Sequence, residues 1–397
     1  MLAGLRRLGR GPSLNKVIFV SYGAFDCNSA GHIAGFAREL IGRGLKVGVC
    51  GRDQILNVHA FGPAPFEFFT LQELTRDPEG VIGFDGRFEP ARTAMVCWTP
   101  RKTSRRVVAK VARQHGVPYV VHFEDNEDHL SELRFAALRD DTAQTDRTER
   151  AALLEGAMGA TIIEGRLKEV LPPGLPSLLL EPGVEFGQFE TPLGPYRRAT
   201  ILRMAGASPD ASVIVYPGNI HRANLDEMVE LYRAMALLRE RGRQVVLLKT
   251  GHDDVSPAEP LGFDPRNVGV VSLGQVERPF LVELLKCADL FVQPGAPGPF
   301  NDYRLPSKLP EFMAVGRPII LPKTNVGLRL RHGVDALLLE RGTADEIAGL
   351  VEAVLADPSL ATRLALNAQA FARKTYRWDR QGRKLADFLA RLHRSRR

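Results

Sequence analysis

Residues 302–311 combine side-chain types that together suit the binding of an anion. The stretch carries two cations, Arg304 and Lys308, and Ser307 stands where a hydroxyl group caps the start of a helix that contains Glu311. A helix N-terminus presents free N–H groups and flanking cations add charge, so the stretch predicts a site for a diphosphate. A surface ion pair between Lys308 and Glu311, three residues apart on one helix face, is the competing interpretation.

A second candidate lies in residues 216–224, where a strand, a glycine turn at Gly218 and a helix start follow one another. Such a turn presents backbone N–H groups to a phosphate, and Arg222, three residues after Asn219, adds charge. A simple tight turn before an amphipathic helix explains the segment equally well. The neighbouring cluster at residues 302–311 favours the anion site.

Lys249 ends the next apolar strand and is followed closely by Gly251. A lysine at a buried strand end is uncommon unless it is paired. The position therefore predicts an anionic partner for Lys249.

The first half of the chain offers polar groups of a different kind. Gly31 allows a ligand to approach the backbone, and His32 is able to contact a hydroxyl or a phosphate, although a lone histidine in a first helical turn is more often simply exposed. Residues 122–129 hold two histidines and four acids, including Glu124 and Asp125. Carboxylates at a strand end accept hydrogen bonds from sugar hydroxyls, act as a base or cap a helix. Their spacing matches no metal-ligand pattern, and no Gly-x-Gly-x-x-Gly dinucleotide fingerprint is present.

Parallel sheets are needed to bring these groups together. Short apolar strands alternate with amphipathic helices from end to end, which is typical of an α/β fold with crossover helices. Ligands of such sheets bind beyond the carboxyl ends of the strands, where each candidate lies. We expect strands at 17–21, 45–50, 94–98, 117–123, 160–163, 177–181, 213–216, 245–249, 268–272, 290–293 and 318–321, and helices at 31–43, 103–115, 343–356, 359–373 and 378–393.

The 397 residues exceed the size of one hydrophobic core, so two domains are expected. Chain breakers cluster at Pro182, Gly183, Pro192 and Pro195, where the strand pattern restarts. We predict two doubly wound, Rossmann-like domains facing across a cleft. Their expected bounds are 1–190 and 191–376, with a helix at 377–397 placed to cross back over the first domain.

The net charge of +7 is concentrated at the two ends of the chain. The ends contribute eight cations, which leaves a net charge of −1 for the body, so a basic groove for nucleic acid is not expected. Basic ends suit contact with anionic lipid, and solubilising tails are an equally good explanation. The cations are Arg6, Arg7, Arg10, Lys16, Arg391, Arg394, Arg396 and Arg397. A charged stretch at 139–150, with Asp140, Asp141, Asp146, Arg147, Glu149 and Arg150, is interpreted as a solvated helix face without a function.

Four scattered cysteines, Cys27, Cys50, Cys97 and Cys287, form no zinc or disulfide pattern and are expected to be reduced thiols of a cytoplasmic protein. No apolar run approaches the roughly 20 residues that span a bilayer, and the N-terminus lacks the apolar core of a signal peptide. We therefore expect a protein that is soluble or peripheral at the inner face of the membrane.

Together these segments resemble the retaining, family 4 type of nucleotide-sugar glycosyltransferases, which have the GT-B fold. The resemblance implies transfer of a hexosyl group, as in polysaccharide biosynthesis, from a nucleoside-diphosphate sugar to a glycan, lipid-linked or small-molecule hydroxyl. It also implies a donor domain at 191–376, an acceptor domain at 1–190, and no cofactor or metal. The segments that carry it are Ala30-Gly31-His32, 181–189, 216–218, 272–276, 288–294 and 311–318, the last being the most specific.

The resemblance assigns Glu311 to the ribose hydroxyls, the loop of Gln275 and Val276 to the base, and the helix start at Ser307 to the diphosphate. The family has two glutamates separated by seven residues, and the first of them is replaced here by Tyr303, with Asp302 adjacent. Acceptor contacts fall to Gly31, His32, Glu124 and Asp125. The expected catalytic residues are Arg304, Lys308 and Asp302, and the expected donor-binding residues are Gly218, Asn219, Arg222, Lys249, Gly251, Gln275, Val276, Ser307 and Glu311.

Two further departures concern positive charge. Asn219 and Asn224 stand where the family has an arginine and a lysine. We therefore expect the charge that neutralises the diphosphate to have moved to residues 302–311. A nucleotide-sugar epimerase or hydrolase with the same fold, and a non-catalytic protein that binds a sugar nucleotide, are the alternatives.

Overall fold

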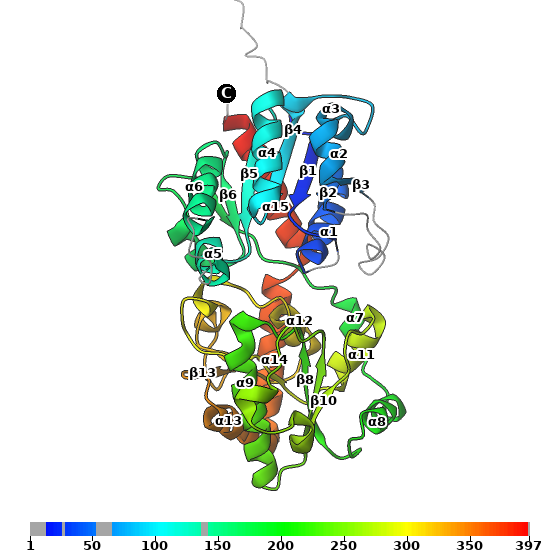
Figure 1. Ribbon diagram of the computed structural model, residues 1–397. Helices are drawn as coiled ribbons and strands as arrows, with labels where there is room; N and C mark the ends of the chain where they lie inside the picture. The colour runs from blue at the N-terminus through cyan, green and yellow to red at the C-terminus, as the bar shows by residue number, and fades with distance from the viewer. Residues whose placement is uncertain (1–12, 26–27, 53–65, 136–141, 396–397) are drawn as a thin grey trace, which may run out of the picture. The chain divides into compact units, whose positions relative to one another are not determined.

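The computed structural model describes residues 13–25, 28–52, 66–135 and 142–395. It divides into two compact units, one made of Met1–Pro182 and Trp378–Arg397, the other of Gly183–Arg377 (Figure 1). The division falls before the predicted boundary at residue 190, because the short helix α7 (Gly187–Glu190) packs on α11 (Arg278–Cys287) and α12 (Leu309–Val315) of the second unit. Residues named above that lie outside the described part are Arg6, Arg7, Arg10, Cys27, Asp140, Asp141, Arg396 and Arg397.

The first unit is built on a seven-stranded parallel sheet in the order β3-β2-β1-β4-β5-β6-β7. This doubly wound order reverses direction between β1 and β4, and such a switch point is where parallel sheets bind ligands. The four-residue strand β3 was not predicted, since its two phenylalanines give no alternation long enough to recognise. The strands are β1 (Lys16–Ser21), β2 (Lys46–Gly51), β3 (Glu67–Thr70), β4 (Thr93–Trp98), β5 (Tyr119–Phe123), β6 (Ala160–Ile162) and β7 (Ser177–Leu179).

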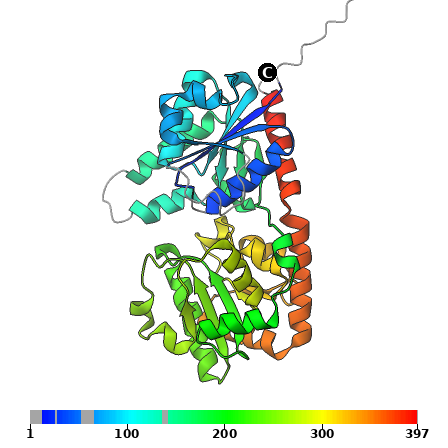
Figure 2. The ribbon, with the colours of Figure 1, turned by 90° about the vertical axis from the view of Figure 1, so that its right-hand side faces the viewer.

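Helices cover both faces of this sheet. The last helix, α15 (Trp378–Ser395), belongs to the first unit and packs along α1 (Asn28–Ile41), with the Trp378 ring edge-on to Phe36 at 5.3 Å between centroids (Figure 2). Leu385, Phe388 and Leu389 bury the apolar face of α15 in the core. The other helices are α2 (Leu71–Arg76), α3 (Pro78–Ile82), α4 (Lys102–His115), α5 (Glu127–Phe135) and α6 (Thr142–Glu155).

Lys16 was expected in a basic tail, and this expectation is wrong. Its side chain is fully buried at the start of β1, where it forms an ion pair with Asp85 and donates to the carbonyl oxygens of Ile82 (2.6 Å) and Arg87 (2.9 Å). Burial raises the pKa of Asp85, but the hydrogen bond and the charge of Lys16 lower it, and the net shift is downward. Lys16 is therefore a core cation. Of the predicted tail, Arg391 and Arg394 are described, and both are exposed on α15.

The second unit repeats the parallel pattern in two three-stranded sheets, β10-β9-β8 and β11-β12-β13. A bridge between Ile214 and Leu290 joins β8 to the segment entering β11, so the switch point lies between these two strands. Strand β13 was not predicted, since three leucines after a turn carry no strand period. The strands are β8 (Ser212–Pro217), β9 (Val245–Thr250), β10 (Val270–Ser272), β11 (Phe291–Val292), β12 (Ile319–Pro322) and β13 (Leu337–Leu339).

The long helices of the second unit are amphipathic, and α9 and α13 pack on each other within its main core. The remaining helices are α8 (Pro195–Met204), α9 (Leu225–Glu240), α10 (Ala258–Leu261), α13 (Ala344–Ala356) and α14 (Pro358–Thr375). Cys50, Cys97 and Cys287 are buried free thiols. Within the described residues, we find no helix with both the length and the apolar character needed to cross a bilayer.

The contact between α1 and α15 depends on a glycine. A Cβ atom on Gly35 would lie 2.2 Å from Cη2 of Trp378, so Gly35→Ala must displace the indole. We expect a loss of about 1–3 kcal/mol in the free energy of unfolding, measured by chemical denaturation. Gly42→Ala is the control, because its nearest contact is the Arg38 carbonyl oxygen at 3.5 Å, and it should leave stability nearly unchanged. Equal stability of the two variants would contradict the packing described here.

Candidate functional site

Three loops meet beyond the carboxyl ends of β8, β9 and β10. The Gly218 N–H donates to the Thr250 carbonyl at 3.2 Å, and the Gly251 N–H donates to the Gly274 carbonyl at 2.8 Å. Gly251 has φ +90°, and a Cβ atom there would lie 2.7 Å from the Gly218 carbonyl carbon. Only glycine fits this close approach, so the two predicted glycines form one rigid floor.

Lys308 lies over this floor. A Cβ atom on Gly218 would come within 3.2 Å of the Lys308 Nζ, a tight contact that would push the amine back by a few tenths of an ångström. The Nζ atom also lies 3.4 Å from the Tyr216 hydroxyl and 4.5 Å from the centre of its ring. Burial and the nearby Arg304 cation lower the pKa of Lys308 to about 7, against the opposing effect of Glu227.

Arg304 is held by the same loop and by α9. Its Nε donates to Asn301 at 3.0 Å, its Nη2 forms an ion pair with Glu227 at 3.2 Å, and the guanidinium lies 3.8 Å from the centre of the Phe300 ring. Burial raises the pKa of Glu227, while Arg304, Asn301 and Lys308 lower it, and the net shift is upward. The structure thus brings the two predicted cations, Arg304 and Lys308, close to one another and to one carboxylate.

The predicted capping role of Ser307 is wrong. Helix α12 begins at Leu309, Lys308 occupies the N-cap position, and no side chain caps the helix. Proline at residues 306 and 310 leaves a tight turn before the helix, which spans only seven residues. The positive charge of the Lys308 side chain, not a capped helix start, is therefore the feature of this loop that suits an anion.

The competing interpretation, an ion pair between Lys308 and Glu311, is also wrong. Glu311 is instead paired with Arg278, whose Nη1 donates to its Oε2 at 3.0 Å and whose Nη2 donates to its Oε1. Sequence spacing did not reveal this partner, because Arg278 begins a different helix, α11, 33 residues away.

Lys249 has the anionic partner that its position predicted, and that partner is a residue of the chain itself. The Lys249 side chain is fully buried, and its Nζ lies 2.6 Å from the Asp253 carboxylate. Arg222 is exposed and, among the described residues, forms no ion pair. Asp302 accepts from the Gly298 N–H at 3.1 Å and from the Thr324 hydroxyl, so it anchors its own loop.

The two asparagines, Asn219 and Asn224, build the glycine loop. The Asn219 side chain accepts from the His252 N–H at 2.9 Å, and the buried Asn224 donates to the Asn219 carbonyl at 3.0 Å. Gln275 is exposed and Val276 partly buried in the loop that follows β10.

A second candidate site lies at the carboxyl edge of the first unit's sheet. Its centre is Glu124, after β5, which is 2.7 Å from His32 Nδ1 and accepts from the Thr99 hydroxyl at 3.1 Å and from Ser29. Burial raises the pKa of Glu124, but His32, His122 and Ser29 lower it, and the net value is about 2. The structure therefore joins two predicted residues, His32 and Glu124, and fixes an ionised carboxylate; Gly31 lies beside His32 in the first turn of α1.

Three buried polar side chains that the sequence did not identify line up in register beside this carboxylate. Ser21 pairs with Trp98 across β1 and β4, and Trp98 pairs with His122 across β4 and β5. Among the residues that the structure describes, the Ser21 Oγ, Trp98 Nε1 and His122 Nε2 atoms have no hydrogen-bond partner, although all three residues are at most 1% exposed. Buried polar atoms without partners are rare and point to a missing ligand or water. The signal available in the sequence was a polar or aromatic residue at the end of β1 and β4 and one residue before the end of β5.

Local backbone strain marks the same edge. Thr99, the residue after β4, has φ +58°, a region that β-branched residues avoid. Its N–H donates to the His122 carbonyl at 2.9 Å and its hydroxyl to Glu124. Burial lowers the pKa of His122 to about 3, so this imidazole is neutral near pH 7. Asp125 lies 4.0 Å from Arg101 at the start of α4.

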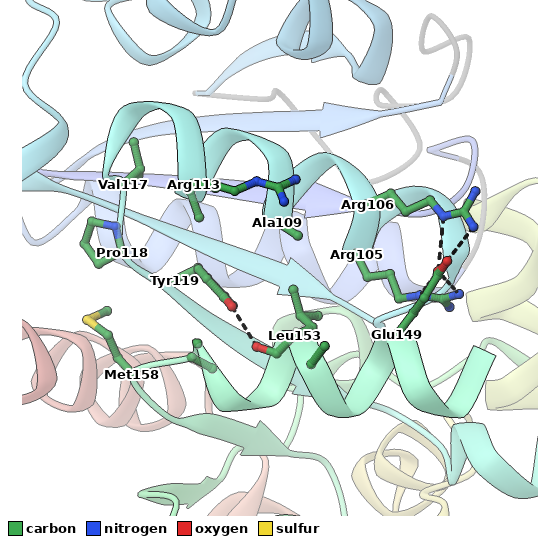
Figure 3. Close-up of a pocket in the computed structure, with 14 residues that line it drawn as sticks. Arg105, Arg106, Ala109, Arg113, Val117, Pro118, Tyr119, Glu149, Leu153 and Met158 are labelled. Carbon is green, nitrogen blue, oxygen red and sulfur yellow. Dashed lines mark hydrogen bonds and ion pairs between the residues drawn. The ribbon is translucent and has the colours of Figure 1, made fainter. Parts of the chain in front are cut away.

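Of the stretch at 139–150, the described residues lie on α6 and are only partly solvated, which corrects the predicted solvated face. Arg105 of α4 is buried and pairs with Asp146 (2.5 Å). Arg105 (2.6 Å) and Arg106 also both pair with Glu149 (Figure 3). Hydrogen bonds from Arg106 and Arg105 lower the pKa of Glu149 to about 2, although burial opposes them. These pairs close one end of a groove of about 830 Å³ between α4 and α6, and they fix α6 on the unit.

Comparison with solved structures identifies the fold class. The parallel sheets and two Rossmann-like units match GT-B glycosyltransferase structures. Anabaena HepE in complex with UDP-glucose gives a TM-score of 0.72 at 15% identity, over 95% of this chain and 99% of that chain. Sucrose-phosphate synthase from Thermosynechococcus elongatus gives 0.67 at 14% identity, over 95% and 99%. A glycosyltransferase from Rickettsia africae gives 0.70 at 11% identity, over 96% and 98%.

The sequence itself matches one family. Residues 211–357 fit the family described as glycosyl transferases group 1, and this range contains the loops around Gly218, Arg304 and Lys308. No curated protein matches the chain. Among the described residues, no group of three or more His, Cys, Asp or Glu side chains is arranged to hold a metal ion.

The environment of Lys308 predicts an unusual titration. We expect the rate of Lys308 acetylation by acetic anhydride, followed by peptide mass mapping, to rise with a midpoint near pH 7, because the amine reacts when neutral. Arg304→Gln should raise this midpoint, since it removes a neighbouring cation and leaves Glu227 to stabilise the ammonium form. Arg266→Gln, at an exposed pair with Asp264, is the control. An unchanged midpoint in Arg304→Gln would show that the two cations do not interact.

Proposed function

We propose that the protein is a glycosyltransferase of the retaining, family 4 type that moves a hexosyl group from a nucleoside-diphosphate sugar to an acceptor hydroxyl. The observation that carries the proposal is the placement of Lys308 and Arg304 over the Gly218 turn, inside the range that matches glycosyl transferases group 1. Two cations beside a glycine turn that allows close approach to the backbone suit a diphosphate. The HepE structure in complex with UDP-glucose supports a nucleotide sugar as the donor.

In this proposal the second unit binds the donor. Lys308 and Arg304 contact the diphosphate above Gly218 and Gly251, with Arg222 as the exposed cation at the rim. Glu311 accepts hydrogen bonds from the ribose hydroxyls. The loop of Gln275 and Val276, together with Asn219, completes the nucleotide pocket.

The reaction needs stabilisation of the leaving group. Charge builds on the diphosphate oxygens as their bond to the anomeric carbon breaks, and cations already in place stabilise that charge without reorganisation. A bound diphosphate favours the ammonium form of Lys308, so in the complex Lys308 and Arg304 supply two positive charges and the proposed reaction needs no metal or cofactor. The acceptor oxygen forms its bond on the face from which the diphosphate departs, and the hydroxyl proton passes to the departing phosphate oxygen, which retains the anomeric configuration.

The first unit binds the acceptor in this proposal. Glu124 is ionised and held by His32, so its carboxylate is able to orient a hydroxyl. The unpartnered atoms of Ser21, Trp98 and His122 offer further hydrogen bonds to a polyhydroxyl ligand. Asp125 and Gly31 lie at the same edge. This set of neutral donors and one carboxylate suits a glycan, or the sugar of a lipid-linked acceptor, better than a nucleic acid.

We also propose a cytoplasmic role in polysaccharide biosynthesis, at an anionic membrane surface. Two cations of the predicted basic ends support this part, because Arg391 and Arg394 are exposed on α15. Lys16 is buried and does not contribute. Binding of the full chain to vesicles with and without anionic lipid tests this part separately from catalysis.

The first experiment identifies the nucleotide. Thermal stabilisation by UDP, GDP and ADP, then by their sugars, is measured on the pure protein. Incubating the stabilising donor alone separates transfer from an epimerase or hydrolase, which converts the donor without an acceptor. The second candidate function is non-catalytic binding of a sugar nucleotide, because Tyr303 stands where the resemblance places an acid. Nucleotide binding without turnover across a broad acceptor panel would favour that candidate.

Lys308→Ala and Arg304→Ala should each lower turnover by more than about tenfold, because each removes a cation that stabilises the leaving diphosphate. Release of the nucleoside diphosphate is measured with the donor and acceptor found above. The control is Lys46→Ala. Lys46 is exposed and is the first residue of β2 in the first unit, at the amino end of that strand. Unchanged Tm shows that the variants remain folded, and wild-type turnover in both site variants would refute the assignment.

Metal independence is tested on its own. We expect turnover in excess EDTA to stay within about twofold of the untreated enzyme, because Lys308 and Arg304 provide the charge that a divalent ion supplies elsewhere. Loss of transfer in EDTA that Mg²⁺ or Mn²⁺ restores would overturn this claim without affecting the assignment of the donor loop.

A further inference from the structure

The carboxylate of Glu311 is not free to turn. Arg278 donates from two different nitrogens to its two oxygens, at 3.0 Å from Nη1 to Oε2 and through Nη2 to Oε1. A bidentate arginine fixes the plane of a carboxylate as well as its charge, which a lysine is unable to do. The pair is only partly exposed, with 28% of the Arg278 and 22% of the Glu311 side chain accessible.

Arg278 is itself held from a third direction. Its Nη2 also donates to Oε1 of Gln188 on α7, at 2.8 Å. Three elements, α7, α11 and α12, therefore meet at one guanidinium, and they are in contact with each other. An arginine that bridges three elements is ordered by the fold, so its position does not depend on a loosely paired surface contact.

The position of Arg278 in the chain links it to the nucleotide loop. It is the first residue of α11, directly after the loop that contains Gln275 and Val276. It thus connects the loop proposed for the base with the carboxylate proposed for the ribose. Each carboxylate oxygen has two lone pairs, and Arg278 uses one on each oxygen, so one on each remains for a pair of adjacent hydroxyls.

We propose that Arg278 is a positioning residue that sets the ribose selectivity of the donor site: it orients Glu311 for the vicinal 2′- and 3′-hydroxyls and so selects ribonucleotides over 2′-deoxyribonucleotides. This inference rests on the proposed function of the second unit as the nucleotide-sugar site. Arg278 itself does not touch the reacting atoms. Its effect is on recognition of the sugar ring of the nucleotide, and it is separate from the charge that Lys308 and Arg304 supply to the diphosphate.

The test measures selectivity by calorimetric titration of the full chain. Wild type is titrated with UDP and 2′-deoxy-UDP, or with the GDP or ADP pair if that nucleotide stabilises the protein. We expect wild type to prefer the ribonucleotide by about tenfold or more, and Arg278→Gln to reduce this ratio to about threefold or less by weakening ribonucleotide binding alone. Arg278→Lys, which keeps the charge and lacks the fork, should lie closer to Arg278→Gln than to wild type.

Glu311→Gln and the double variant complete the design. If Arg278 acts through Glu311, Glu311→Gln lowers the ratio to the same extent, and the double variant shows no further loss. Arg266→Gln is the matched control, because Arg266 also forms a bidentate pair, with Asp264, on the same unit and away from these loops. It should leave the ratio and both affinities unchanged.

The outcomes are distinct. An unchanged ratio in a folded Arg278→Gln, with Tm near that of wild type, overturns the proposal. Tighter ribonucleotide binding by Arg278→Gln also overturns it, because Arg278 would then block Glu311. If wild type binds none of the three nucleoside diphosphates, the proposed function fails as a whole and the selectivity fails with it. Normal ribonucleotide binding with a ratio near one in wild type refutes the selectivity alone.

Discussion

The charged site of the second unit depends on close packing between the Gly218 turn and Lys308. A Cβ atom on Gly218 would lie only 3.2 Å from the Lys308 amine, which lies over the ring of Tyr216 and within 3.4 Å of its hydroxyl. Gly251 meets Gly218 from the next loop, at a φ that favours glycine. Two glycines thus bring a lysine onto a backbone floor at the switch point of the sheet, and the charge of the site follows from this packing.

Electrostatics explains why this charge is available to a ligand. Arg304 and Lys308 repel each other, and Glu227 compensates only part of their charge, because it is itself disfavoured as an anion by burial. A site with surplus, partly desolvated positive charge gains more from an arriving anion than two solvated cations do. In the first unit the arrangement is opposite in sign, since an ionised Glu124 is surrounded by His32, Ser29 and Thr99.

Apolar strand periodicity predicted most of the fold, and turn chemistry predicted the Gly218 turn and the cations of residues 302–311. Strands β3 and β13 were not predicted because two phenylalanines and three leucines in a row form no recognisable strand period. The ion-pair partners of the charged residues were harder to predict. Lys16 pairs with Asp85, Lys249 pairs with Asp253, and Glu311 pairs with Arg278 on another helix. Such pairings depend on tertiary packing. The row formed by Ser21, Trp98 and His122 depends on strand register, which is set only when the sheet assembles.

The two asparagines explain why the Gly218 loop carries little positive charge of its own. Asn224 is buried, donates to the Asn219 carbonyl and accepts from the His221 N–H at 2.8 Å, so its amide serves as both donor and acceptor inside the loop. A lysine has no acceptor and would place a cation near Lys308. A lysine at residue 224 would therefore leave the His221 N–H without its acceptor. In the proposed donor site, the positive charge for the diphosphate then comes from across the switch point, from Lys308 and Arg304.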